Sequence, residues 1–421
     1  MFLDRLLYLF MCAYVILLPL LSSNKMSIMG IHVPPADCIL ALIILVYIVK
    51  FILSKECRGR FFSGIKDFFT SYLTIFISIL ALMMLISISY AGEKTIALSE
   101  SFRFISYIVL FFIIKYEYNK KELLNGILGS YIAVSAVLCI YGIYQYFTGF
   151  GLNEKFENYG YAKFKIMATM DNPNNLAAFL VLAIFPIIML SIYEKERIKK
   201  LFYILLTIIM LLNIAFTGSR NAIVGIVVGM IVLIVLYSLK LIIPLFVVAA
   251  AALFVPGVRD RILDISDPVQ NQSRIYLWSI AKKMIVDHPI FGVGNGNYVS
   301  LYNKYVEIYP QYKFYGYSRY PCHNSYLKIE SELGIIGGIS FVAVLISSLI
   351  QVKTFINTVK SNFYKYFYTG FLASMIAFYV MNLFDNLFFV PKTTTYFWIL
   401  LAVSQGMMYR EKNNSIFIRS F

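Results

Sequence analysis

Long apolar segments recur along the whole chain and are separated by short polar connections. Such segments are typical of helices that cross a membrane, because a helix of about 20 residues spans the hydrocarbon core of a bilayer. A membrane β-barrel is excluded, since its strands would alternate polar and apolar residues. The pattern predicts an all-α integral membrane protein with about twelve transmembrane helices, at 6–22, 36–53, 71–91, 104–116, 125–147, 175–193, 199–216, 221–238, 240–256, 334–352, 364–384 and 393–409. Only Lys240 separates the eighth segment from the ninth, so a count of eleven is also open.

The composition of the chain agrees with this prediction. The 421 residues are 60% hydrophobic and 14% charged, with a mean hydropathy of +0.75, whereas soluble domains carry about 25% charged residues. A soluble globular protein is therefore excluded. Lys and Arg number 37 against 22 Asp and Glu, a net charge of +15. In a membrane protein this surplus indicates cytoplasmic loops and anionic lipid, so membrane lipids are expected partners and nucleic acid is not.

The distribution of basic residues predicts the orientation of the chain. A cytoplasmic N-terminus places most Lys and Arg of the short loops and tails on the cytoplasmic side, as the positive-inside rule requires. Both termini are then cytoplasmic, and the first apolar segment, which no A-x-A-like cleavage site follows, is a retained span. We divide the chain into transmembrane helices 1–9 (1–256), an extracytoplasmic cap loop (257–325), and transmembrane helices 10–12 with a cytoplasmic tail (326–421).

The cap loop between the ninth and tenth spans has the sequence features of an ordered, partly helical segment. Apolar residues at helical spacing over 275–285 predict an amphipathic helix on the membrane surface, with Ser273 as its N-cap. One proline and three glycines over 288–296 predict a turn. Nine tyrosines follow over 298–326. They form either an aromatic belt at the membrane interface or flat faces on which sugar rings stack.

Two arginines on the predicted outer side are candidate anion-binding residues. Arg220 lies in a tight turn between two spans, where it either grips lipid phosphate or clamps a substrate phosphate in bidentate fashion. Arg274 follows the predicted N-cap, and a helix N-terminus favours anions, although a solvated surface arginine is the alternative. Together the two side chains suit a substrate that carries a diphosphate.

Among the three histidines, His323 is the candidate general base, because it stands in a polar motif where the cap returns to the membrane. The alternative is a structural histidine, which is the expected role of His32 and His288. Asn174 or Asn175 is expected to cap the helix that follows Pro173.

No site for a metal or another cofactor is expected. The chain has no D-x-D sequence, and the i, i+2 spacing of Glu330 and Glu332 puts their carboxylates on different helix faces. It contains no nucleotide-binding glycine motif, and its five cysteines form no CxxC pair. Energy for any reaction would come from the substrate itself or from an ion gradient.

The order of these motifs resembles the bacterial O-antigen ligase and O-antigen polymerase superfamily over about 170–340. The matching motifs are Asn172-Pro173-Asn174, Thr217-Gly218-Ser219-Arg220, Arg274, His288-Pro289-Ile290-Phe291-Gly292-Val293-Gly294 and His323-Asn324-x-x-Leu327 before Glu332-x-Gly334-x-x-Gly337.

The resemblance implies an inverting glycosyltransferase that needs no metal or nucleotide. Such an enzyme moves a glycan from undecaprenyl diphosphate to an acceptor hydroxyl at the outer face of the cytoplasmic membrane. Arg220 and Arg274 would hold the diphosphate, His323 would deprotonate the acceptor, and the supporting residues would be Asn324, Glu332 and Asn174.

Alternatives of activity stay open within this resemblance. A polymerase would use a second lipid-linked glycan as acceptor, whereas a ligase would use another acceptor such as a lipid A core of lipopolysaccharide. The tyrosine-rich cap favours the polymerase weakly, since it could cradle two similar glycans. A transporter or flippase of lipid-linked oligosaccharide is the alternative from another class, because twelve spans with cytoplasmic termini is also a common transporter layout.

Overall fold

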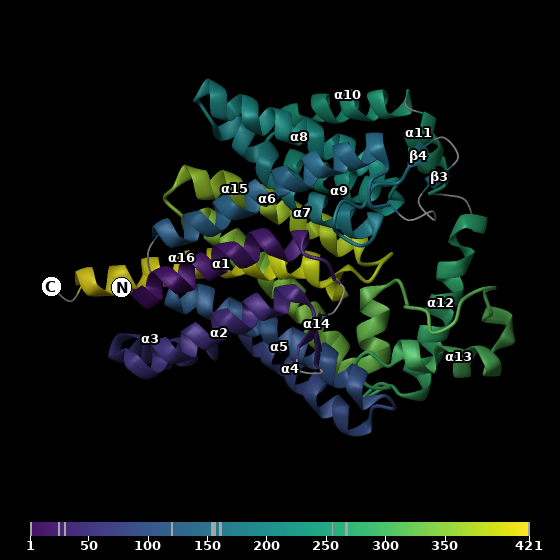
Figure 1. The fold of residues 1–421 in the computed structure, drawn as a ribbon, viewed down its shortest axis with the longest axis horizontal. Helices are drawn as coiled ribbons and strands as arrows, with labels where there is room; N and C mark the ends of the chain where they lie inside the picture. The colour runs from purple at the N-terminus through teal and green to yellow at the C-terminus, as the bar shows by residue number, and fades with distance from the viewer. Residues whose placement is uncertain are drawn as a thin grey trace.

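The computed structural model describes residues 2–419, apart from 24–25, 29–30, 119–120, 153–156, 160–161, 255 and 266–267. The described part is almost entirely helical (Figure 1). Its strands form two antiparallel hairpins, β1 (Met26–Ile28) with β2 (Ile31–Val33) and β3 (Glu157–Tyr159) with β4 (Ala162–Phe164). The longer helices are α1 (Phe2–Leu20), α2 (Pro35–Leu53), α3 (Lys55–Phe68), α4 (Tyr72–Tyr90), α5 (Lys94–Phe112), α6 (Lys121–Thr148), α7 (Pro173–Tyr193), α8 (Arg197–Thr217), α9 (Arg220–Leu236), α12 (Pro268–Asp287), α14 (Ser325–Thr358), α15 (Asn362–Met381) and α16 (Pro391–Arg419). The shorter ones are η1 (Ile113–Glu117), η3 (Leu239–Leu241), α10 (Ile242–Leu253), α11 (Pro256–Leu263), α13 (Tyr298–Ile308), η4 (Pro310–Tyr312) and η5 (Leu387–Phe389).

Each of the apolar segments predicted from the sequence contains a helix, but fewer helices meet the requirements of a span. In the described ranges, 8 helices are long and apolar enough to cross a membrane: α1, α2, α4, α5 with η1, α6, α7, α8 and α14. The segment predicted at 240–256 forms only the 12-residue helix α10, which is about 18 Å long at 1.5 Å per residue, whereas the hydrocarbon core is about 30 Å thick. The predicted count of twelve spans is therefore not confirmed by these helices.

The fourth predicted segment, 104–116, also begins too late. The helix α5 starts at Lys94, and its polar residues Glu100 and Arg103 lie inside it. Ser101 of this helix is buried and bonded to Asn295 (Nδ2 to Oγ, 3.1 Å), which shows why polarity here does not mark a loop.

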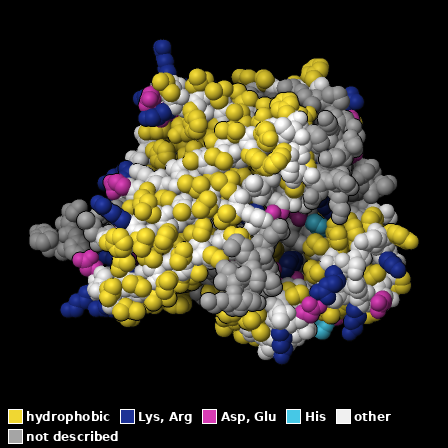
Figure 2. Space-filling view, in the orientation of Figure 1, with side chains coloured by type: hydrophobic (Ala, Val, Ile, Leu, Met, Phe, Trp, Pro, Cys, Tyr) yellow, Lys and Arg dark blue, Asp and Glu magenta, His cyan; other side chains and the backbone are white. Residues whose placement is uncertain are grey.

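The helices of the bundle run side by side, with both chain ends at one end of the molecule and α11, α12 and α13 at the other (Figure 1). Figure 2 shows hydrophobic side chains over the middle of this face, while charged side chains gather toward its two ends. This distribution is the one expected of a protein that spans a bilayer many times.

The helix α7 lies at the centre of the bundle, packed against α8 and α15, and most of its side chains are buried. Pro186 lies within α7 and has no N–H to bond the carbonyl of Leu182. Ser374 of α15 donates to that carbonyl instead, at 2.9 Å. Gly370 allows this close approach, because a Cβ there would lie 2.3 Å from the carbonyl oxygen of Phe185.

The cap has a small hydrophobic core of its own, formed by α12, α13 and the turn between them. The predicted turn over 288–296 is present, and it is hydrogen-bonded to the first part of α14: Val293 N donates to Ser331 O (2.9 Å) and Gly294 N to Glu332 O (2.8 Å). A kink at Gly334 (φ 65°) makes room for the turn, since a Cβ there would lie 2.1 Å from the carbonyl oxygen of Ile290.

Two predicted helix caps are wrong. The helix α12 begins at Pro268, so Ser273 and Arg274 lie inside it and not at its N-terminus. Proline suits a first helical position, since its fixed φ matches the helix. The helix α7 is capped by Asn172, whose side chain accepts from Asn174 N at 2.8 Å, and not by Asn174 or Asn175.

Candidate functional site

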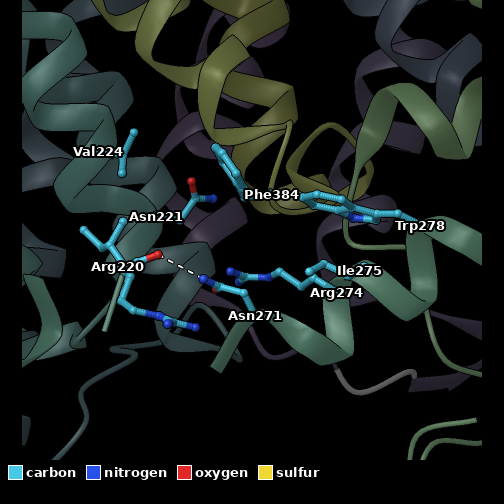
Figure 3. Close-up of a pocket in the computed structure, with 9 residues that line it drawn as sticks. Arg220, Asn221, Val224, Asn271, Arg274, Ile275, Trp278 and Phe384 are labelled. Atoms are coloured by element: carbon cyan, nitrogen blue, oxygen red, sulfur yellow. Dashed lines mark hydrogen bonds between the residues drawn. The ribbon is translucent and has the colours of Figure 1, made fainter. Parts of the chain in front are cut away.

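A pocket of about 220 Å³ lies between α9, α12 and the segment that follows α15 (Figure 3). The chain turns sharply into α9, because Gly218 takes a left-handed φ of 61° at the end of α8 and Ser219 then caps α9. This turn makes Arg220 the first residue of α9, and its side chain lines the pocket. The lining residues are Arg220, Asn221, Val224, Ile265, Asn271, Arg274, Ile275, Trp278 and Phe384.

The structure brings the two candidate arginines together in this pocket. Arg220 belongs to α9 and Arg274 to the second turn of α12, and Figure 3 shows both guanidinium groups directed into the space between these helices. Arg220 donates from Nη1 to the carbonyl oxygen of Asp264 at 2.5 Å. Two planar guanidinium groups in one pocket can hold two phosphate groups of one ligand.

Two further basic residues strengthen the positive charge beside Arg220. A Cβ on Gly218 would lie 3.0 Å from Lys165 Cε and 3.8 Å from Arg261 Nε, so both side chains gather at this turn. Burial, followed by the positive charges of Arg261 and Arg220, lowers the pKa of Lys165 to about 8. The positive charges that gather at this turn mark a place where an anion would be attracted.

His323 forms a hydrogen-bonded pair with Asp385, a residue to which the sequence assigned no role. The distance from His323 Nδ1 to Asp385 Oδ1 is 2.9 Å, and Asn174 Nδ2 donates to the other carboxylate oxygen at 3.1 Å. Burial acts to raise the pKa of Asp385, but the hydrogen bond and charge of His323, the N–H of Asn386 and the charge of Arg274 outweigh it, and the pKa is lowered. Asp385 is therefore a carboxylate.

This pairing suits His323 to accept a proton. A carboxylate only accepts hydrogen bonds, so a neutral His323 carries its proton on Nδ1 and has a lone pair on Nε2. Nothing among the described residues is hydrogen-bonded to Nε2, and the side chain of His323 is 25% exposed. The negative charge of Asp385 would stabilise the imidazolium that forms when Nε2 takes a proton.

The side chains that flank this pair also form the wall of the pocket. Trp278 donates from Nε1 to the carbonyl oxygen of His323 at 3.3 Å, and Phe384 immediately precedes Asp385. Both rings line the pocket, with centroids 6.2 Å apart. His323 is thus not itself a lining residue, but it lies directly behind one wall of the pocket that holds the two arginines.

Asn324 joins the segment just before α14, which contains His323, to the segment after α15, which contains Asp385. Its side chain caps α14 by accepting from the N–H groups of Tyr326 and Leu327, and its Nδ2 donates to Leu383 O at 2.9 Å. Its own N–H donates to Asn386 Oδ1 at 2.9 Å. The supporting position predicted for Asn324, like that of Asn174, therefore lies beside the pair.

Glu332 lies elsewhere and has a different environment. It is fully buried, pairs with Lys328, and accepts from the N–H groups of Gly296 (2.8 Å) and Tyr298 (3.2 Å). These contacts tie the glycine-rich turn and the start of α13 to α14. The carboxylate thus maintains the shape of the cap and has no place in the pocket.

The cap tyrosines do not form a single group. Tyr298, Tyr302 and Tyr305 are buried in the core of the cap, whereas Tyr315 is 97% exposed. Tyr320 stacks on Tyr317 at 3.7 Å, and its ring centroid lies 5.5 Å from that of His323. Part of the predicted aromatic surface is therefore structural, whereas Tyr317 and Tyr320 adjoin the site.

Among the residues that the structure describes, no group of three or more His, Cys, Asp or Glu side chains could hold a metal ion. The sequence assigns no role to Asp385, because this residue lies 62 residues from His323 in the chain. The local sequence signal for Asp385 was a carboxylate between two asparagines, Asn382 and Asn386, at the end of an apolar segment.

Two comparisons with known proteins bear on the family of this chain. A search of curated proteins found no match. The family model described as O-Antigen ligase matches residues 205–342, a region that contains Arg220, Arg274 and His323. The resemblance of this chain to the O-antigen ligase and polymerase superfamily is thereby confirmed over these residues, and the chain is a multi-pass membrane protein with a role in glycan transfer for surface polysaccharide assembly.

Proposed function

We propose that this protein transfers a glycan from undecaprenyl diphosphate to an acceptor hydroxyl, with the pocket of Arg220 and Arg274 as its donor site. One observation carries the proposal: the two arginines share a pocket whose wall is formed by the neighbours of His323 and Asp385. Such a transfer needs cations that stabilise a diphosphate leaving group and a base that accepts the proton of the hydroxyl. The two arginines and His323 are suited to these roles.

In the proposed reaction the histidine and the two arginines act on the same substrate. His323 Nε2 takes the proton of the acceptor hydroxyl while the hydroxyl oxygen attacks the anomeric carbon. The bond from that carbon to the diphosphate oxygen breaks, and the carrier diphosphate leaves with the bonding electrons. Arg220 and Arg274 neutralise the charge that builds on the leaving group, which lowers the barrier. An in-line attack inverts the anomeric centre. The proton rests on His323, where Asp385 stabilises the imidazolium.

The proposed site faces outward from the bacterial cytoplasmic membrane. Both chain ends lie at the end of the bundle opposite α12 and α13 (Figure 1), and the basic loops of the sequence favour a cytoplasmic position for the ends. An even number of crossings is required by this placement, and we propose twelve. The short helix α10 would then cross with η3 and with local thinning of the bilayer.

The transporter alternative receives no support from the position of the pocket. Transporters bind substrate near the bilayer midplane with broken helices, whereas Arg220 lies at the first residue of α9, where a helix meets the cap. The glycan product distinguishes the two remaining activities, polymerase and ligase.

The test is the size distribution of undecaprenyl-linked glycan in cells that carry His323→Ala, with membrane insertion checked. Single repeat units should accumulate if the protein is a polymerase, and long polymer on its carrier if it is a ligase. The matched control is His288→Ala, because this histidine is exposed in the turn after α12 and should leave the distribution normal. A normal distribution in the His323→Ala cells would refute the proposal.

A further inference from the structure

A second polar pocket, of about 290 Å³, lies between α1, α2, α5 and α16 and shares no lining residue with the arginine pocket. Its polar lining comes from Asp37, Ser99, Arg103, Tyr107 and Thr395. Phe102, on its rim, is 59% exposed on the outside of the bundle, where lipid would lie. Ionisable side chains that line a lipid-facing pocket are costly and are therefore a sign of function.

One side of the pocket is formed by helix ends at the cap end of the bundle. Leu18 is near the end of α1, Asp37 is in the first turn of α2, and Pro391 begins α16. The segment before α7 joins this end to the first site, since Thr169 donates to Pro19 O (2.6 Å) and accepts at its carbonyl from Lys392 (2.6 Å). The pocket thus extends from these helix ends inward to Arg103 and Tyr107, which lie within α5.

Several polar groups of this pocket have no hydrogen-bond partner among the described residues. Neither Arg103 nor Asp37 forms a side-chain hydrogen bond or close ion pair with another residue that the structure describes, although the charge of Arg103 acts on Asp37. The hydroxyl of Tyr107 is buried, with the residue 5% exposed, and has no hydrogen-bond partner among the same residues. A buried donor without a partner is unfavourable, so a ligand that accepts from these groups would be stabilised there.

We propose that this pocket binds the phosphate of a lipid headgroup, with Arg103 and Tyr107 as donors and Asp37 as acceptor for a donor group beside the phosphate. A guanidinium fits a phosphate in bidentate fashion. Two lipids offer this chemistry: phosphatidylethanolamine places an ammonium beside its phosphate, and a second lipid-linked glycan places a sugar hydroxyl beside its diphosphate. The proposal does not depend on the transfer reaction.

The test is native mass spectrometry of the full chain released from lipid nanodiscs. One arm uses phosphatidylethanolamine nanodiscs, and the other adds undecaprenyl diphosphate as the probe for a lipid carrier. We expect Arg103→Gln to lower retention of the bound lipid by about tenfold to a hundredfold, as the loss of a charged hydrogen bond predicts. Tyr107→Phe removes only the unpartnered hydroxyl and should lower retention by about fivefold. Arg197→Gln, at an exposed arginine outside both pockets, is the matched control.

The two pockets are distinguished by the double variant Arg220→Ala with Arg274→Ala. It should keep the lipid at the second pocket even where it loses transfer, so failure of the proposed reaction leaves this proposal standing. If Arg103→Gln and Tyr107→Phe lower lipid retention in the phosphatidylethanolamine arm, the bound lipid is a phospholipid. If they lower retention only in the undecaprenyl diphosphate arm, it is the carrier lipid. Retention equal to wild type in both Arg103→Gln and Tyr107→Phe, or a loss seen only in the double variant, would overturn the proposal.

Discussion

The substitution Asp385→Asn isolates the role of the carboxylate behind His323. It keeps the size of the side chain but removes its charge. It also leaves one acceptor oxygen where the structure uses two, since Oδ1 accepts from His323 and Asn386, and Oδ2 accepts from Asn174. One of these donors must therefore face the new amide nitrogen. The imidazolium that forms during transfer would lose its negative partner.

The size of the effect follows from the geometry of the pair. The hydrogen bond is 2.9 Å long and Asp385 is only 8% exposed, so solvent does not replace the lost interaction. Hydrogen bonds to charged groups contribute about 1.5–3 kcal/mol, which corresponds to a decrease in kcat of roughly tenfold to 150-fold. The KM for the lipid-linked donor should stay nearly constant, because the interaction strengthens only when the proton moves.

The assay is glycan transfer in proteoliposomes with a lipid-diphosphate donor, with Glu307→Gln in the exposed part of α13 as the control carboxylate. A double-mutant cycle with His323→Ala shows whether Asp385 acts through the histidine. In the His323→Ala background, Asp385→Asn should have little further effect on the rate. A full additional decrease in that background would refute the assignment of Asp385 as the residue that positions His323.

Three further predictions concern charge and packing. Because the pKa of Lys165 is lowered to about 8, its charge is lost as the pH rises through that value, so the KM for the donor should rise between pH 7 and pH 9 and stay flat in Lys165→Arg. Gly334→Ala should destabilise the cap by about 3 kcal/mol or more in thermal unfolding, since φ is positive and Ile290 O blocks a Cβ. At Gly338 the atom nearest to an added Cβ is 3.6 Å away, so Gly338→Ala should instead stabilise the helix by roughly 0.5–1 kcal/mol in the same measurement. Ser374→Ala leaves a carbonyl of α7 without its donor and should cost about 1 kcal/mol in the same measurement. A KM independent of pH, equal melting of the glycine variants, or an unchanged melting temperature for Ser374→Ala would contradict the respective argument.

The helices could be predicted from the sequence because long apolar segments have few alternatives in a membrane protein. The predicted helix boundaries were wrong where polar residues lie inside a helix. The first turns of α5 contain Glu100 and Arg103 and were placed in a loop, although one face of that helix is buried against its neighbours. The prediction also failed at α10, which is apolar like a span but ends after 12 residues.

The site could be predicted only in its parts. The tight turn before α9 and the polar motif at 323–327 carry local signals, so Arg220 and His323 stood out individually. Their relation to Asp385 is a tertiary contact across 62 residues, which no local pattern encodes. Glu332 shows the converse, because its motif suggested support for the site, whereas its contacts hold the turn of the cap.

Separate measurement of donor binding and transfer tests the central claim most directly. Purified variants in nanodiscs would be titrated with undecaprenyl-diphosphate-linked glycan and then assayed for product. We expect Arg220→Ala and Arg274→Ala to weaken donor binding by about tenfold or more each, whereas His323→Ala should bind the donor normally and form product only at a small residual rate. Normal binding in both arginine variants, or product formation by His323→Ala at the wild-type rate, would contradict this claim.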